Sequence, residues 1–593
     1  MSFPNSAGVY DRIVDKSFVV SAGGLLAGGI VVSAKRGPTK INTVTSAREF
    51  IETYGTPSRD NPSLYAALRF LNRAGILTVR RVINDALVAG GSVTHEIQED
   101  GTFIPSVAGS ALVNTTGIDT VAGGTIIVGG TNVTIAENAT VSVVVEAINI
   151  ADIDGYSAVV DGTDIIISNQ SGNVSADLSA IGLSDNITSS NYEEGGFIEG
   201  ETVQVPHLTI SASSAGAWGN SVEVSFAQNP DLPSGVFILV VKENGEEVES
   251  FEVSRDENAK NGFGSNIYIE NVINGKSRYI TVEDNPSVSQ SYDMTAPVLL
   301  AGGFDDTIAP TAGAIIQAWE EFENVDNVPA QILINGGWAV PAVQVKMLSV
   351  AENRKDAVAI LDVPQDTAED VAAMVDYRKN DLAANTYFGG LYGGWVKIYD
   401  QYNDREVNIA PSGDVAAVFV HTVNVAERWD APAGLQRGII PNALGVSKIL
   451  SEGERDLLYV AGVNPVTTYG GAAAVIWGQK TLQVAASALD RFNVVNSVLW
   501  INQRIAQALQ PFVFEPNTVA TRDNINFLVS SFLENIQQRG GLYGFYVDTS
   551  EEINTPFVID NNQLYVDYYL KPTRTAEFIR ASAIITATGV QLG

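Results

Sequence analysis

Few side chains in this chain have the types and spacing needed for chemistry. The 593 residues include three histidines and no cysteine, which excludes disulfides and thiol catalysis and argues against a His/Cys zinc site. A Ser/His/Asp triad would need His95, His207 or His421, and no serine lies in a GxSxG elbow. His421 follows an expected strand over residues 415–420 and is the best placed of the three. We expect it to be structural.

Two other patterns resemble ligand sites only in part. The glycines of residues 23–29 are not followed by Gly-Lys-Ser/Thr, which a phosphate loop requires. Asp152 and Asp154 could begin a calcium loop, but the other ligand positions of such a loop are missing. Carboxylate pairs elsewhere lie among turn residues, where solvated side chains are usual. The sequence therefore predicts no catalytic residue, no metal site and no cofactor.

The composition indicates a large, ordered and acidic protein. Apolar residues make up 45% of the chain, charged residues 17%, and the formal net charge is −33. This charge argues against nucleic acid as a direct partner, and the length predicts roughly three or four domains. The apolar stretch over residues 18–34 contains four glycines. We expect it to be a buried strand and turn, not a signal peptide, and we expect no membrane insertion.

Strand and helix patterns alternate along the chain and predict a mixed α+β, multidomain fold with α/β core domains. Helices are expected over residues 45–54, 62–73, 314–322, 340–353, 368–380, 494–509 and 522–538, and buried strands over 76–82, 330–334 and 357–361. The pairs Asn244-Gly245 and Asn274-Gly275 each lie between strand patterns. Both predict two-residue hairpin turns.

Residues 96–206 are expected to form an inserted, all-β, acidic domain that faces solvent. Nineteen Asp or Glu residues and no Lys or Arg lie between Arg81 and Lys242, so more than half of the net charge arises there. Short Val/Ile/Thr runs separated by Gly, Asn and Asp are typical of a small β domain. These runs are residues 124–128, 132–136, 140–147, 158–160 and 164–168.

Both ends of the chain carry strand patterns. Residues 9–16 alternate near the N-terminus, and residues 544–547, 563–570 and 578–588 form strand-like runs near the C-terminus. A strand close to a chain end can close its own sheet or extend the sheet of another molecule. The periodicity alone favours an internal edge strand for residues 578–588.

Several short stretches occur in a fixed order along the chain. They are GVY at 8–10, KRGP at 35–38, AWGN at 217–220, GGFD at 302–305, RKDAVAILD at 354–362, WVKIYD at 395–400, APSG at 410–413, APAG at 431–434, AGVNPV at 461–466, WGQKT at 477–481 and DNN at 560–562. Together they resemble the tail sheath proteins of contractile-tail bacteriophages, which are related to the sheaths of phage-tail-like bacteriocins. The acidic insertion lies outside this resemblance.

The resemblance implies a structural protein. Sheath subunits stack as hexameric rings around an inner tail tube and contract to drive the tube through the host envelope, using energy stored at assembly. The implied partners are further copies of the chain, the inner tail tube protein, and baseplate and tail terminator proteins. The implied location is the virion, after assembly in the host cytoplasm.

The resemblance also implies that strands pair between subunits. The implied donor residues are Val9, Tyr10, Ile13 and Val14 in an N-terminal arm, and Phe578, Ile579, Ile584 and Ile585 in a C-terminal arm. The implied acceptor residues are Leu564, Val566 and Tyr568. By analogy, the helix over residues 522–539 contacts the tube through Arg522 and Arg539.

The expected domains follow from these assignments. They are residues 1–20 as an extended arm, 21–95 and 207–380 as a middle α/β domain, 96–206 as the insertion, and 381–593 as a C-terminal sheath core that ends in the second arm.

Two other functions fit parts of the sequence. A secreted surface-layer or adhesin-like β-rich protein would share the acidity, the Thr/Val content and the absence of cysteine. Cleavage of the N-terminus would favour that alternative. An enzyme such as a hydrolase would depend on His421, and full activity of a His421→Ala variant would remove its only candidate base.

Overall fold

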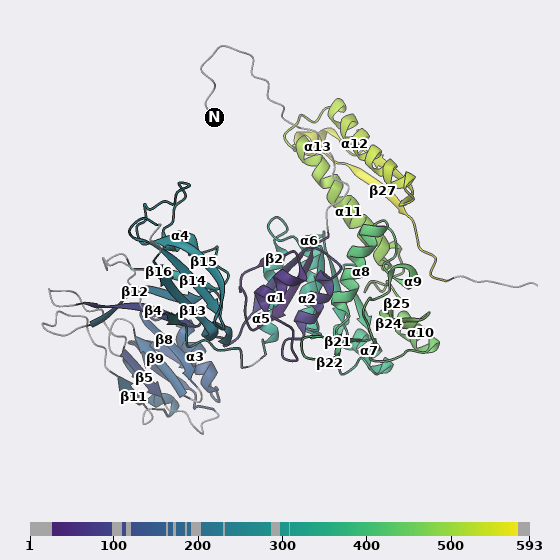
Figure 1. Cartoon of the computed structure of the whole chain (residues 1–593). Helices are drawn as coiled ribbons and strands as arrows, with labels where there is room; N and C mark the ends of the chain where they lie inside the picture. Colours follow the sequence, from purple (N-terminus) through teal and green to yellow (C-terminus); the bar gives the residue numbers. More distant parts are fainter. Residues whose placement is uncertain are drawn as a thin grey trace, which may run out of the picture. The chain divides into compact units, whose positions relative to one another are not determined.

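The structure, a computed structural model, describes residues 26–97, 109–113, 120–161, 164–169, 174–183, 187–190, 203–228, 232–285, 297–307 and 309–578. These residues divide between two compact units (Figure 1). The first unit comprises Met1–Ala89, Ala212–Val222 and Ala301–Gly593, and the second comprises Gly90–Ser211 and Glu223–Leu300. Both helices and sheets are present, which confirms the predicted mixed, multidomain architecture.

An eight-stranded sheet forms the centre of the first unit, in the order β2-β3-β1-β18-β19-β20-β24-β25. Its strands are β1 (Gly28–Ser33), β2 (Asn42–Val44), β3 (Leu77–Val82), β18 (Ile332–Ile334), β19 (Val358–Asp362), β20 (Gly389–Gly393), β24 (Val463–Tyr469) and β25 (Ala472–Ile476). The inner strands run parallel, whereas β2 and β25 pair antiparallel at the two edges. Parallel strands are buried on both faces, which explains the apolar runs Ile332–Ile334 and 357–361 within the segments predicted as strands.

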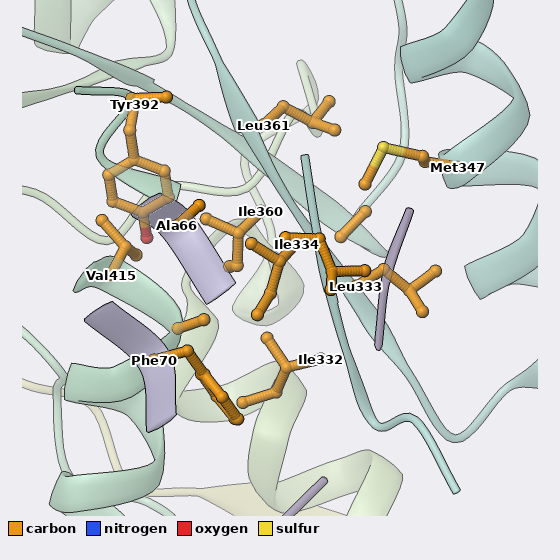
Figure 2. Close-up of a cluster of buried hydrophobic side chains, with 14 of the residues drawn as sticks. Ala66, Phe70, Ile332, Leu333, Ile334, Met347, Ile360, Leu361, Tyr392 and Val415 are labelled. Carbon is orange, nitrogen blue, oxygen red and sulfur yellow. The ribbon is translucent and has the colours of Figure 1, made fainter. Parts of the chain in front are cut away.

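Helices cover both faces of this sheet. The helices α2 (Ser63–Leu71) and α8 (Ser412–Val425) pack on one face, and α5 (Ala312–Glu320) and α6 (Pro341–Arg354) pack on the other. Figure 2 shows how the strand residues alternate: Ile332, Ile334 and Ile360 point towards Phe70 and Val415, whereas Leu333 points towards Met347. The first unit also contains α1 (Ala47–Tyr54), α7 (Val371–Asp376), α9 (Gly434–Arg437), α10 (Glu452–Ala461), and a small sheet of β21 (Val396–Asp400), β22 (Arg405–Ile409) and β23 (Gly445–Val446).

Two glycines let the helical layers approach β1 closely. A Cβ atom at Gly28 would lie 2.7 Å from the ring of Phe70, and a Cβ atom at Gly29 would lie 2.8 Å from Phe322. Glycine in a strand interior commonly marks such a close approach. The prediction of a buried glycine-rich strand is confirmed for its described part, and residues 18–25 lie outside the described residues.

The expected strand over residues 415–420 is wrong, because these residues belong to α8. Residues 412–420 are all buried, so this part of the helix has no solvent-exposed face. A continuous apolar run does not distinguish a buried strand from a helix that is buried all round. His421 therefore lies on a helix.

Stretches that are far apart in the sequence meet in this unit. The buried carboxylate of Asp362 accepts hydrogen bonds from the Ser412 amide (2.8 Å), the Ser412 hydroxyl (2.7 Å) and the Gly337 amide (3.0 Å). Burial raises the pKa of Asp362 to about 6, and the bonds from Ser412 oppose that shift. The Asn464 Oδ1 atom likewise accepts from the Lys480 amide at 2.6 Å. Asp362 and Asn464 thus provide hydrogen-bond partners for buried polar groups of distant segments.

The second unit is built mainly of sheets. Its described strands are β4 (Gly90–Ile97), β12 (Val203–Ala212) and β16 (Ile280–Asp284); β13 (Val222–Ala227), β14 (Val236–Glu243), β15 (Glu246–Ser254) and β17 (Val298–Leu299); β5 (Gly109–Val113), β8 (Tyr156–Asp161), β9 (Asp164–Asn169) and β11 (Ile187–Ser190); and β6 (Gly124–Val128), β7 (Thr131–Ile135) and β10 (Ala176–Asp177). Asn244 and Gly245 have φ angles of 53° and 84°, which confirms the predicted hairpin turn between β14 and β15.

The insertion is not all β. Residues 140–147, predicted as a strand, lie in the helix α3 (Val141–Ile150) except for Thr140, which is its N-cap. Val144 and Ile148 are buried at helical spacing against the neighbouring strands. Packing of this apolar stripe outweighs the β-propensity of the valines.

The hairpin predicted at Asn274-Gly275 is also wrong. The helix α4 (Ile269–Ile273) precedes this pair and β16 follows it. Asn274 has a φ angle of −66°, and its side chain exchanges two hydrogen bonds with the backbone of Val282. An asparagine that bonds a distant backbone segment is not free to form a type I′ turn.

Candidate functional site

The candidate site is a two-stranded sheet at one end of the first unit (Figure 1). The helices α11 (Phe492–Leu509) and α12 (Val519–Gln538) precede β26 (Leu542–Asp548), and α13 (Pro556–Asp560) precedes β27 (Asp567–Pro572). β26 and β27 pair antiparallel with a bulge next to Leu542. The predicted strand over residues 563–570 is confirmed only from Asp567, and β27 continues to Pro572.

One face of this sheet packs on its own helices. The shared core consists of Trp429, Trp500, Ile501, Ile505, Ile525, Val529, Leu533, Ile536, Leu542 and Val547. The predicted acceptor residues Leu564, Val566 and Tyr568 pack partly buried against this core. The Tyr568 hydroxyl also donates to Asn502 Oδ1 of α11 at 2.7 Å. The structure thus brings all three onto the helix-facing side of the chain.

The opposite face is aromatic and exposed. Tyr543, Tyr546 and Tyr569 are 68%, 60% and 59% exposed, and the rings of Tyr546 and Tyr569 lie 6.0 Å apart across the two strands. Exposed aromatic side chains that cluster on one surface are typical of a contact with another protein.

Both outer edges of this sheet are open within the part of the chain that the structure describes, because there β26 and β27 pair only with each other. An isolated two-stranded sheet is marginally stable in water, and unpaired edges are templates for further strands. Within the described residues, the outer edges of β26 and β27 therefore have no strand partner.

Two asparagines that sequence reasoning missed hold this sheet in place. Asn554, 1% exposed, accepts from the Tyr565 amide at 2.8 Å and donates to the Tyr565 carbonyl at 3.0 Å. Asn526 on α12 donates to the Val547 carbonyl at 3.2 Å. Their sequence surroundings resemble ordinary turn and helix-surface segments, so no local pattern marks them.

The two predicted tube-contact residues have partners within the chain. Arg522 is 5% exposed and donates to Asn517 Oδ1 at 2.8 Å. Arg539 pairs with Glu427 at 2.6 Å, and its guanidinium lies 5.5 Å from the centre of the Trp429 ring. A tube contact through these residues stays a prediction, and only Arg539 presents much of its side chain to solvent.

Most predicted donor residues lie outside the described residues. These are Val9, Tyr10, Ile13, Val14, Ile579, Ile584 and Ile585. Phe578, the last described residue, is 82% exposed.

Three polar side chains that could do chemistry, His421, Asp305 and Asp306, lie outside this sheet. His421 lies half-buried on α8, and burial and the nearby charge of Arg73 lower its pKa. Asp306 accepts three backbone amide bonds, and Asp305 accepts from the Ala217 amide and pairs with Lys35. No group of three or more metal-ligating side chains lies together in the described residues. Among the described helices, none is both long and apolar enough to cross a membrane.

Comparison with known proteins places these features in a family context. Residues 309–482 match the phage tail sheath protein central domain, and residues 485–586 match the phage tail sheath C-terminal domain. The two matches together cover slightly less than half of the chain. The second match contains the whole two-stranded sheet.

Two curated relatives are tail sheath proteins. The chain is 28% identical over 396 residues to that of Enterobacteria phage T4, which covers 63% of this chain and 59% of the relative. It is 28% identical over 384 residues to that of Vibrio phage KVP40, which covers 60% of this chain and 56% of the relative. The chain therefore spans less than two thirds of the length of each.

The fold has a counterpart among solved structures. The sheath tail protein of Listeria innocua aligns with a TM-score of 0.53 at 10% identity, covering 93% of this chain and 96% of that protein. At this identity the likeness concerns the fold alone.

Proposed function

We infer that this chain, which carries the central and C-terminal domains of phage tail sheath proteins, is a structural subunit of a contractile tail sheath. The observation that carries this inference is the β26–β27 sheet. It lies within the matched C-terminal domain and has two open edges in the described part of the chain. Its function is to accept strands from neighbouring copies.

Strand donation has a clear energetic basis. Each added strand makes several backbone hydrogen bonds of roughly 1 kcal/mol net each, and its alternate side chains extend the apolar face over α11 and α12. The N-terminal arm, with Val9, Tyr10, Ile13 and Val14, and the C-terminal arm from Phe578 are the proposed donors. Leu564, Val566 and Tyr568 belong to the acceptor.

Repetition of this contact generates a polymer. A donor and an acceptor at different places on one subunit make a head-to-tail contact, which closes into rings or continues as a helix. We propose stacked hexameric rings around an inner tail tube, ended by baseplate and terminator proteins, as a virion component assembled in the host cytoplasm. Contraction would release energy stored in one of two packings of the same subunits.

The proposed domains follow the same scheme. Residues 1–20 form the first arm, 21–95 and 207–380 the middle domain, 96–206 the outward-facing insertion, and 381–593 the sheath core with the second arm. Contact with the tube is proposed for the α12 end near Arg539.

Electron microscopy of the full chain expressed alone tests the function. Tubular polymers with a ring-like repeat are expected, and persistent monomers at high concentration would exclude the proposal. A chain that ends at Phe578 keeps every described element but lacks the other proposed C-terminal donor residues, Ile579, Ile584 and Ile585. Such subunits should remain folded by circular dichroism, fail to polymerise, and shorten wild-type polymers when mixed in as a minor component. Unfolding of the shortened chain would show instead that the arm closes its own domain.

A further inference from the structure

The chain does not leave the β26–β27 sheet freely. Immediately after β27, the amide and hydroxyl of Thr573 donate to the Gly541 carbonyl, each at 3.2 Å. From there the chain runs along the first unit towards α9 and β25 (Figure 1). The chain is thus still attached to the end of the sheet at Thr573.

Glu577 is held by three side chains that all lie outside the two-stranded sheet. The Arg491 Nε atom donates to both carboxylate oxygens, at 2.8 Å and 3.0 Å. The Tyr459 hydroxyl donates at 2.7 Å, and Gln479 Nε2 donates at 3.2 Å. Gln479 also donates to the Thr575 hydroxyl at 2.7 Å. Each carboxylate oxygen of Glu577 thus accepts two hydrogen bonds.

The holding groups are themselves fixed. Gln479 is 2% exposed, and its Oε1 atom accepts from the Asn493 amide at 3.3 Å. The Tyr459 ring has Lys480 Nζ at 4.5 Å and the Arg491 guanidinium at 5.6 Å from its centre. Burial, and then the charge of Glu577, raise the pKa of Tyr459, so its hydroxyl stays a donor. A rigid, prearranged set of donors loses little entropy when it binds.

The Glu577 contact lies directly before the point at which the described chain becomes exposed. The Arg491 and Glu577 side chains are only 22% and 20% exposed, whereas Phe578, the next residue, is 82% exposed. Fifteen residues follow Phe578. Fully extended, they would span roughly 50 Å, so their reach is measured from Glu577 and not from the end of β27.

We propose that Tyr459, Gln479 and Arg491 form a clamp on Glu577 that fixes the point and direction in which the C-terminal arm leaves its subunit for a neighbouring copy. This inference rests on the proposed function. The clamp shortens the free part of the arm and raises its effective concentration at the neighbour's sheet. When subunits rotate, the clamp also transfers any pull on the arm to α10 and the start of α11. The two-stranded sheet therefore does not carry that load.

The first test uses the monomer. Trypsin cleaves after Arg574, which precedes the clamp, and the Lys571-Pro572 bond is resistant to it. At a concentration too low for assembly, cleavage after Arg574 should be about tenfold faster in Glu577→Ala than in wild type, because local opening exposes the site more often. Tyr459, Gln479 and Glu577 line a cavity of about 400 Å³. The Asp456→Asn variant is the matched control, since this exposed carboxylate lines that cavity as well. Equal cleavage in all three chains would overturn the clamp.

The second test uses assembly. The critical concentration, measured by sedimentation, should rise about tenfold in Glu577→Ala and stay unchanged in Asp456→Asn. The exchanged pair Arg491→Glu with Glu577→Arg should recover part of the loss, which a merely structural defect would not do. If wild type fails to polymerise, the proposed function fails. If wild type and Glu577→Ala polymerise alike, the clamp fails while the sheath function stands.

Discussion

At Asp414, burial and an ion pair act on the same carboxyl group in opposite directions. Its Oδ1 atom lies 2.7 Å from Arg69, and the Asp414 side chain is 3% exposed. Burial nevertheless dominates and raises the pKa of Asp414 to about 6. The Oδ2 atom has no hydrogen-bond partner among the described residues. The first unit therefore contains a carboxylate that is poorly stabilised when charged.

An Asp414→Asn variant tests this balance. Because the folded pKa lies above the ordinary value of 3.8, Asp414 contributes stability that is fully present below about pH 4 and is lost as the pH rises to about 6. The asparagine variant lacks this dependence. Its stability relative to wild type should therefore rise between pH 4 and pH 7, as measured by urea unfolding. A difference that is the same at both pH values would show that the carboxyl is not shifted.

Among the elements, β27 depends on the segment that leads into it. Asn554 pairs with both backbone groups of Tyr565 just before β27, and without it these partly buried groups would lose their partner within the chain. The position of β27 therefore depends on the buried side chain of Asn554 as well as on the pairing of β27 with β26.

We expect Asn554→Ala to lower the free energy of unfolding by about 2 kcal/mol, because it removes the partly buried bonds to Tyr565 and the buried bond to the Thr549 carbonyl. Urea unfolding followed by the fluorescence of Trp500 in the adjacent core would measure the change. Asn561→Ala is the control, since the Asn561 side chain makes one exposed bond to the Phe557 carbonyl, and its effect should stay within about 0.5 kcal/mol. Equal effects of the two changes would contradict the assignment.

The sequence predicted most elements where local signals agree. The helix predicted over residues 45–54 is α1, which begins at Ala47 after the capping residue Ser46, and the Asn244-Gly245 turn has the predicted left-handed angles. The sequence missed α3 and α8, because a short apolar run carries the same signal in a strand and in a buried helix. The pairing of Asn554 with Tyr565 was not predictable, because it depends on how the irregular chain between β26 and β27 folds back on itself.

At the scale of the whole molecule, the acidic insertion over residues 96–206 lies within the second unit and is flanked by two paired strands. β4 and β12 pair antiparallel, with Ile97 directly opposite Val203. The residues between them include fifteen carboxylates and no Lys or Arg. This large negative charge is thus carried by a segment that begins and ends at two neighbouring residues of one ladder.

Replacement of residues 98–202 by Asn-Gly should therefore leave a folded chain. Ile97 and Val203 would flank a two-residue turn, the geometry that Asn-Gly favours. We expect this variant to polymerise like wild type in sedimentation and electron microscopy, because the insertion is proposed to face outwards. The loss of polymers by a variant that stays folded would refute that placement. The sequence alone indicated the insertion through its charge but not the β4–β12 ladder, because long-range register leaves no local pattern.

The strand order of the central sheet also means that β1 is synthesised long before β18, one of its two partners. β1 pairs with β18 through Gly28 and Ile332, and the whole second unit is encoded between these two strands. A ribosome that adds about 5–20 residues per second needs roughly 15–60 seconds to make this stretch. During that time β1 has β3 beside it but lacks its other neighbour, while the second unit can complete its own sheets. The nascent chain therefore presents an apolar strand edge long before the subunit is finished, and its yield in the cell should depend on how well that edge is shielded during translation.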